Sequence, residues 1–390
     1  MSRAAIISID GHVRASRAIY REYVESRFLE DYDSWVHSVE GTVDAGNLNP
    51  QFGPEVQWDS GIRLRDLESN GVVAEVLFPN GLPLQSQGLQ DVGKVLGPEL
   101  SRQSQLAYNR WLADFCADAP GRRSGQAVVS FDDIEQAVKD VHWAKDHGLG
   151  GIMMPPLYPG GTFFFDPVLD PIWAAIQEVG LPISQHGGTG APAYGPGGFA
   201  AIMTLALEHS FFSGRSLWQM ILGGVFDRFP NLKVVFVETE ADWIAPIIRK
   251  LDRRLSWGDD WLGFARFLQR DRPFERTAHE YFESNCYAGI SPFTCEQVPL
   301  EELGAETGDD VFTIKADNAM FGVDYPHFES IFPSTPVHVE ELVGHPSITE
   351  ATARKILYQN AAEVYGFDVG QLASDVERIG FDLPQAAGVA

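Results

Sequence analysis

Short apolar segments recur along the chain, and most of them end in a polar or charged residue. Between them lie longer segments with apolar residues at helical spacing, a pattern typical of strands that alternate with helices. The predicted strands are residues 6–9, 72–78, 126–130, 151–154, 180–186, 232–238, 282–287 and 320–324. The predicted helices are residues 63–70, 101–118, 134–147, 171–178, 202–229, 243–255, 299–303 and 309–316. This alternation predicts an α/β fold, a closed (β/α)8 TIM barrel.

Four of these strands end in side chains that bind metals. The first ends in Asp10 and leads to His12, the fifth ends in His186, the sixth in Glu238 and the eighth in Asp324. Residues i and i+2 of a strand point to the same face, so Asp10 and His12 can bind one ion together. The C-terminal strand ends of a barrel meet on one face. The pattern therefore predicts a site for zinc, iron or manganese, with all five residues as candidate ligands.

The composition is that of one large catalytic domain. The chain has 390 residues, of which 44% are hydrophobic and 21% are charged. We interpret residues 1–390 as a single metal-dependent barrel domain, with an insertion at 13–60 near the active site and a C-terminal extension at 366–390. Three cysteines without a Cys-x-x-Cys pair indicate neither a disulfide framework nor a zinc ribbon.

The net charge of -25 argues against nucleic acid or an anionic membrane as a partner, because both would repel such a surface. No run of about eighteen apolar residues is present, and the first residues lack the apolar segment of a signal peptide. We therefore expect a cytoplasmic enzyme whose partner is a small-molecule substrate. An anionic substrate would need a locally positive pocket, which a metal ion can provide.

Three long loops follow strands and are therefore expected on the C-terminal, catalytic face of the barrel, at residues 13–60, 156–169 and 187–203. Their aromatic residues favour a largely apolar substrate over a sugar or nucleotide. No Gly-rich phosphate loop and no organic cofactor is indicated. The candidate substrate contacts are Asn80, Tyr158, Phe164, Tyr194 and His209. Arg63 and Arg65 precede the second strand, so we expect them away from the pocket mouth, in a structural role.

Several segments together resemble the amidohydrolase superfamily, in the branch (amidohydrolase 2) that also contains aminocarboxymuconate semialdehyde and resorcylate-type decarboxylases. These segments are Ile9 to His12, Leu181 to Gly188, Gly224 to Glu238, Ala241 to Ile244 and Phe321 to His327, and the resemblance covers most of residues 4–365. It implies that Asp10, His12, His186 and Asp324 bind a divalent ion that activates water or polarises a substrate oxygen. It also implies that Asp324 accepts the proton of that water and that the enzyme is a homodimer.

The chain departs from the family pattern at three positions. The superfamily usually begins with His-x-His, whereas this chain has Asp10, and Ala15 stands where many relatives have a glutamate. The sixth strand usually ends in a histidine, which serves as an acid/base group in the decarboxylases, and here it ends in Glu238. Glu238 can orient His186 or a metal-bound water, act as a general base, or bind a second metal ion. We expect His327 at the rim of the pocket, in a catalytic or supporting role.

These features leave the reaction open. The main expectation is metal-dependent hydrolysis of a small, largely apolar substrate by metal-activated water. One alternative is non-oxidative decarboxylation of a cyclic or aromatic acid. Another is a non-haem di-iron monooxygenase, because the carboxylate-rich set resembles a di-iron site in composition, with His209 or His327 as further ligands. A metal-binding protein without catalysis is the last alternative, and one or two ions per chain are compatible with the pattern.

Overall fold

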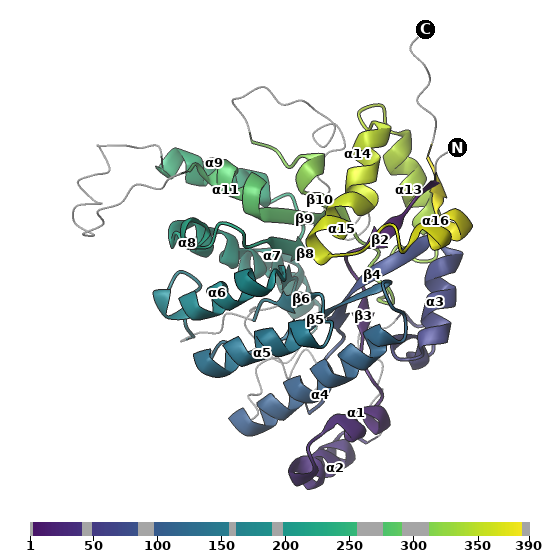
Figure 1. The fold of residues 1–390 in the computed structure, drawn as a ribbon, viewed down its shortest axis with the longest axis vertical. Coiled ribbons are helices and arrows are strands. Elements are labelled where there is room, and N and C mark those ends of the chain that lie inside the picture. The colour runs from purple at the N-terminus through teal and green to yellow at the C-terminus, as the bar shows by residue number, and fades with distance from the viewer. Residues whose placement is uncertain are drawn as a thin grey trace, which may run out of the picture.

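Eight parallel strands form the centre of the computed structural model, which describes residues 3–40, 49–84, 97–155, 161–188, 198–255, 276–290 and 312–383. From one neighbour to the next, these strands are β2 (Ile6–Ser8), β4 (Val72–Pro79), β5 (Arg123–Val128), β6 (Gly151–Met153), β7 (Ile183–His186), β8 (Val234–Val237), β9 (Cys286–Ile290) and β10 (Ala319–Phe321). Every neighbouring pair is parallel, and helices surround the strands (Figure 1). The prediction of a (β/α)8 barrel is confirmed.

The barrel closes between its first and last strands. The backbone N–H of His12 donates to the carbonyl of Tyr325 at 2.8 Å. The backbone N–H of Asp324 donates to the carbonyl of Asp10 at 3.0 Å. In addition, β3 (His12–Val13) pairs with the end of β4. The two segments that are richest in candidate metal ligands therefore lie side by side.

Helices cover the outside of the barrel, and their ends follow local sequence signals. The Asp133 side chain accepts a hydrogen bond from Gln136 N at 3.0 Å and caps α5, while α6 ends at Gly180 with a left-handed φ of 68°. The longer helices are α1 (Arg17–Tyr23), α2 (Leu29–Ser38), α3 (Ser60–Ser69), α4 (Pro98–Ala117), α5 (Ile134–Asp146), α6 (Asp170–Val179), α7 (Phe199–Leu222), α9 (Ile244–Leu255), α11 (Ala278–Asn285), α13 (Thr335–Gly344) and α16 (Ala373–Ile379). Shorter helices are α8 (Val225–Arg228), α14 (Glu350–Arg354) and α15 (Asn360–Tyr365).

The seventh strand begins later than predicted. Residues 282–285 belong to the end of α11, and β9 starts only at Cys286. Thr277 and Glu280 form a reciprocal capping box, which starts a helix immediately before this aromatic segment. The apolar run alone could not show this, because a short apolar segment is compatible with either a strand or a buried helix.

The predicted helix at 202–229 is divided in two. It consists of α7 and α8, because Gly224 between them has a left-handed φ of 65° that ends the helical path. The predicted helix at 299–303 and residues 309–311 of the next one lie outside the described residues. The helix predicted at 309–316 is wrong for residues 312–315, which form no regular element, and only the short 3-10 turn Ala316–Asn318 begins at its last residue.

The strands are buried and largely apolar. All residues of β2, β7 and β8 are buried, as expected for strands covered by side chains inside the barrel and by helices outside it. Among the described residues, no helix combines the length and the apolar character that a membrane span requires.

The end of the described chain packs against its beginning. Strand β1 (Arg3–Ala4) pairs antiparallel with β11 (Phe381–Asp382). Arg378 of α16 donates to both carboxylate oxygens of Glu68 on α3, at 2.6 and 2.7 Å. Arg378, together with Arg122, lowers the pKa of Glu68 to about 2. These pairs fasten the C-terminal extension to the barrel.

We expect Glu68→Gln to lower the melting temperature at pH 7 by about 1–2 °C, since a partly exposed ion-pair network contributes roughly 1 kcal/mol. Folding depresses the pKa of Glu68 from 4.5 to about 2, so its stabilisation is complete above pH 4.5 and disappears as the pH falls toward 2. Calorimetry of both proteins between pH 7 and pH 2.5 measures this difference. A difference that stays constant over this range would contradict the assignment to ion pairing.

Candidate metal centre

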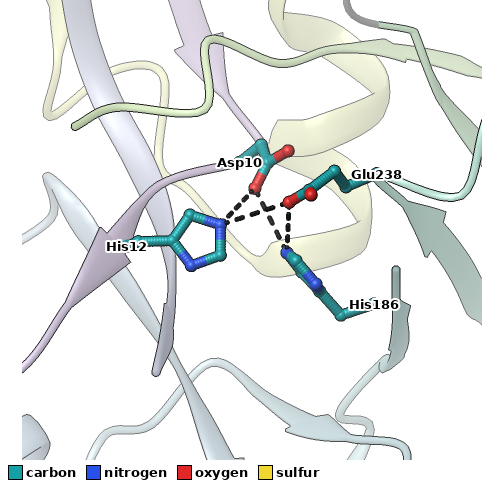
Figure 2. Close-up of side chains that lie close together, drawn as sticks. All are labelled: Asp10, His12, His186 and Glu238. Atoms are coloured by element: carbon teal, nitrogen blue, oxygen red, sulfur yellow. Dashed lines mark ion pairs between the residues drawn. The ribbon is translucent and has the colours of Figure 1, made fainter. Parts of the chain in front are cut away.

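Candidate ligands from three strand ends meet at the C-terminal end of the barrel. Asp10 follows β2, His186 ends β7 and Glu238 follows β8, while His12 begins β3. One nitrogen or oxygen of each lies within 4.8 Å of the corresponding atoms of the others. Figure 2 shows the four side chains pointing toward a common space. Residues that lie far apart in the sequence thus form one cluster.

A second group overlaps the first. It consists of His12 and Glu238 again, with Asp324 and His327 from the segment after β10, and its ligand atoms also lie within 4.8 Å of one another. The two groups share His12 and Glu238. Together they contain three carboxylates and three imidazoles, a set large enough for one or two divalent ions.

The distances place imidazole nitrogens directly against carboxylates. His12 Nε2 lies 3.3 Å from Asp10 Oδ1, 3.2 Å from Asp324 Oδ1 and 3.5 Å from Glu238 Oε2. His186 Nε2 lies 3.2 Å from Glu238 Oε2 and 3.5 Å from Asp10 Oδ1. Each nitrogen therefore faces more than one oxygen, as the ligands around an ion do.

Several of these buried atoms have no hydrogen-bond partner among the described residues. They are Asp10 Oδ1, His12 Nε2, Glu238 Oε2 and both carboxylate oxygens of Asp324. Leaving one buried polar atom unsatisfied costs about 1–3 kcal/mol, and more for a charged group. A bound cation would satisfy all of them together, and mixed imidazole and carboxylate ligands suit manganese, iron or zinc. The residues present therefore fit a divalent metal.

The backbone turns sharply at two of the carboxylates. Glu238 has a φ of 52° and Asp324 a φ of 59°, in the left-handed region that side chains other than glycine rarely adopt. Gly187 allows the turn at Glu238, since a Cβ at this position would lie 1.9 Å from the carbonyl oxygen of Glu238. Such strain is typical of functional sites, where the surrounding structure holds the side chain in place.

The cluster shifts the protonation of its members. Burial lowers the pKa of His12, but contacts with Asp10, Asp324 and Glu238 outweigh burial and raise it well above its usual value. Burial likewise lowers the pKa of His186, and the charges of Glu238 and Asp10 raise it overall. Burial raises the pKa of Asp10, yet the two histidines hold it far below its usual range. Without a metal, protonated histidines balance the carboxylates.

Sequence analysis missed three side chains near the cluster or underestimated them. The His327 ring stacks on the His12 ring with centroids 3.8 Å apart, and its Nδ1 lies 2.9 Å from Asp324 Oδ1, so it belongs to the cluster instead of the rim. Phe78 packs against His186 with ring centroids 4.6 Å apart. Burial, together with the charges of Asp324 and Glu238, raises the pKa of Glu329 to about 8. The only sequence signal for Glu329 is its position two residues after His327.

The candidate substrate residues are not gathered in the same way. Asn80 is buried at the end of the second barrel strand and donates to Gln57 Oε1 at 2.7 Å. Phe164 packs its ring on Trp173, 6.3 Å between centroids, and the half-buried His209 contacts the carbonyl of Ala206 within its own helix. Tyr158 and Tyr194 lie outside the described residues. Substrate contacts for these five residues stay a prediction.

Comparison with known proteins identifies similar families and folds. Residues 32–367 match the amidohydrolase family. An amidohydrolase from Mycobacterium avium subsp. paratuberculosis K-10 is 20% identical with a TM-score of 0.68, covering 95% of this chain and all of its own. A 5-carboxyvanillate decarboxylase from Novosphingobium aromaticivorans DSM 12444, solved with bound manganese, is 19% identical with a TM-score of 0.65, covering 93% and 97%. A 2,6-dihydroxybenzoate decarboxylase from Rhizobium is 16% identical with a TM-score of 0.61, covering 93% and 99%. No curated protein shows significant sequence similarity to the chain.

Metal binding to the chelator-treated protein near pH 7 is expected to release protons, because His12 and His186 have raised pKa values and a ligand must give up its proton. These raised pKa values keep protons bound at low pH, so metal affinity should increase as the pH rises. Calorimetric titrations with Mn²⁺ in buffers of different ionisation enthalpy measure the protons released.

His186→Gln should reduce that number by up to one proton. His147→Gln serves as the control, because its ring stacks on Trp143 outside the cluster, and it should release as many protons as the wild type. Equal proton release by all three proteins would mean that His186 is not a ligand.

Proposed function

The chain belongs to the amidohydrolase family, and we propose that it is a divalent-metal-dependent decarboxylase of a small cyclic or aromatic acid, acting without oxygen. The placement of Asp324 carries this proposal. Its carboxyl group is completely buried, lies in the cluster 3.2 Å from His12, and adjoins His327. An acid held beside a metal position is what the protonation of a substrate carbon requires. The solved decarboxylases of the same fold support the choice of reaction.

In this proposal one ion binds to the first of the two groups. Asp10, His12, His186 and Glu238 would hold one ion, with Asp324 on its remaining side. When bound, a divalent ion supplies a Lewis acid that draws in the anionic substrate and stabilises negative charge on its oxygens. Manganese, iron and zinc all suit these ligands.

The chain's own residues then supply the proton. The bond between the ring carbon and the carboxylate breaks, carbon dioxide leaves, and the electron pair stays on the ring carbon. Asp324 is placed to transfer a proton to that carbon, and a proton from solvent replaces it. Asp324 Oδ1 lies 2.9 Å from His327 Nδ1, which is placed to relay that solvent proton.

The main expectation from the sequence is hydrolysis. It would use the same residues, but the direction of proton transfer at Asp324 would be reversed. Asp324 would take a proton from water instead of donating one to carbon. We favour decarboxylation because solved proteins of the same fold are named as decarboxylases of aromatic acids. The two reactions are distinguished by whether carbon dioxide is released.

The second group of ligands supports one other candidate. Glu238 and His12 lie in both groups, so Asp10 and His186 could hold one ion and Asp324 and His327 another, with Glu238 near both and His12 on one of them. One divalent ion among three carboxylates leaves a net negative charge, whereas two ions leave a positive one. A carboxylate-rich centre of two irons would activate oxygen and hydroxylate an apolar substrate, as in non-haem di-iron monooxygenases.

Elemental analysis of protein purified without added metal, followed by assays on hydroxylated aromatic acids, tests both candidates. We expect about one manganese, zinc or iron per chain, and carbon dioxide release that continues in the absence of oxygen. If the protein contains two irons per chain and consumes oxygen, the oxygenase becomes the assigned function instead of the decarboxylase. Product formation without carbon dioxide and without oxygen uptake would return the assignment to hydrolysis.

Asp324→Asn is expected to lower kcat by at least about 100-fold, because the amide has the same shape but cannot donate the required proton. Single-turnover kinetics at saturating metal measure this loss. The matched control is Asp317→Asn, which removes an exposed partner of Lys355 and should leave kcat unchanged. A D324N enzyme with nearly normal kcat would exclude Asp324 as the proton donor.

A further inference from the structure

A buried ion pair lies directly beneath the metal centre. Arg63 on α3 donates from Nε and Nη2 to the two carboxylate oxygens of Glu75 on β4, both at 2.8 Å. The side chains are 0% and 2% exposed. An isolated buried pair is expensive, because both charges lose their hydration. Further interactions must therefore compensate for the hydration that the two charges lose.

The other donors of Arg63 reach the backbone of the ligand segments. Nη1 donates to the carbonyls of His12 at 3.0 Å and Val56 at 3.3 Å, and Nη2 donates to the carbonyl of Tyr325 at 3.3 Å. All five N–H groups of the guanidinium thus have acceptors. The guanidinium also lies 4.9 Å from the centre of the Tyr325 ring. A single rigid group connects the segment of Asp10 and His12 with the segment of Asp324 and His327.

Gly11 rests on this pair. A Cβ on Gly11 would lie 3.0 Å from Arg63 Nη2 and 3.0 Å from Glu75 Oε2. Gly11 is not among the glycines with a positive φ, so its backbone conformation does not require glycine. A side chain at this position would instead crowd the ion pair and also the carbonyl oxygen of Val76, which would lie 3.3 Å from the Cβ. Gly11, which lies between Asp10 and His12, therefore packs directly against Arg63 and Glu75.

From these contacts we propose that Arg63 and Glu75 are positioning residues, which hold the two ligand segments at the separation that metal binding requires. This inference rests on the metal centre of the proposed function. It adds to the expectation that Arg63 lies away from the pocket mouth in a structural role, because the buried guanidinium contacts the ligand segments. The residue starts on the helix before β4, but its long side chain ends beneath His12. Groups behind metal ligands commonly change affinity by about 10–100-fold when removed.

The chain contains a matched control in the same ion cluster. Arg123 also has a fully buried side chain, and its Nε lies 3.7 Å from Glu75 Oε1. Its hydrogen bonds go to the carbonyl of Phe115 at 2.7 Å and to Ser60 Oγ at 3.0 Å. None of its bonds in the described part of the chain joins the ligand segments. Arg63→Lys and Arg123→Lys therefore both disturb the same buried ion cluster. Only Arg63→Lys removes hydrogen bonds to the carbonyls of His12 and Tyr325 in the ligand segments.

The experiment measures metal binding instead of turnover. Full-length wild type, R63K, R123K and G11A are stripped of metal, titrated with Mn²⁺ for affinity, and reloaded with Co²⁺, whose visible spectrum reports ligand geometry. We expect R63K and G11A to weaken Mn²⁺ binding by about 10–100-fold and to change the Co²⁺ spectrum. R123K should lose thermal stability yet bind Mn²⁺ within about twofold of the wild type, with the wild-type spectrum.

The possible outcomes decide the proposal. If R63K and R123K lose the same Mn²⁺ affinity, Arg63 has only a structural role and the proposal is wrong. The proposal is also wrong if G11A has the Mn²⁺ affinity and the Co²⁺ spectrum of the wild type. If R63K does not fold, G11A still decides, because it keeps both Arg63 and Glu75 and changes only the residue that packs against them. A wild-type chain that binds no divalent metal would overturn the metal centre itself. Failure of decarboxylation alone would leave these binding results untouched.

Discussion

Three carboxylates that meet in one small space must share a positive charge, and the architecture of the site depends on this requirement. Asp10 and Asp324 are buried, and the Glu238 side chain is 24% exposed. Asp10, Glu238 and Asp324 all lie within reach of the same histidine nitrogen. Their mutual repulsion is strong because little water screens it. In the absence of metal, the raised pKa values of His12 and His186 supply the charge as protons. A divalent ion supplies it better, since it also satisfies the carboxylate oxygens that lack hydrogen bonds.

This repulsion explains why the backbone around the cluster is so tightly constrained. Left to relax, the carboxylates would separate, yet Glu238 and Asp324 are held in left-handed conformations that point them at the centre. Gly187 gives the room for one turn, and the bond from Asp324 N to Asp10 O secures the other. The guanidinium of Arg63 restrains the same region, because it donates hydrogen bonds to the carbonyls of His12 and Tyr325. The fold thus opposes the repulsion with rigid contacts, which prepares the ligands for an ion.

Sequence analysis could recover the residues whose chemistry coincides with a strand end. Asp10, His12, His186, Glu238 and Asp324 follow apolar runs, and parallel strands bring such ends to one face regardless of the details of packing. The position of His327 depended on a ring stack with His12, which no spacing encodes. The contact between Arg63 and the carbonyl of His12 could not be predicted, because a pattern locates the Cα atom, whereas a long side chain can end several ångströms beyond it.

Loops and element boundaries were harder for a related reason. The aromatic segment 282–285 is helical because of the capping box before it, a local signal that outweighs the β preference of the run. Phe164 packs on Trp173, because an aromatic residue in a loop gains as much from the core as from a ligand, and its contact with a substrate stays a prediction. Substrate contacts therefore follow from tertiary packing, whereas metal ligands follow from topology.

The ion pair beneath the site also affects what the centre can bind. Arg63, Arg123 and Glu75 together carry one positive charge, adjacent to the ligand segment through Gly11. With a single divalent ion, that charge offsets the excess of the three carboxylates, so an anionic acid can approach without net repulsion. With two ions the centre would be strongly positive and would need a bridging anion before an apolar substrate could bind. Glu329, whose pKa is raised to about 8 mainly by burial, adds no charge near neutral pH. The charge balance of the whole region therefore suits one ion with a carboxylate substrate, and two ions only with a bound oxygen anion.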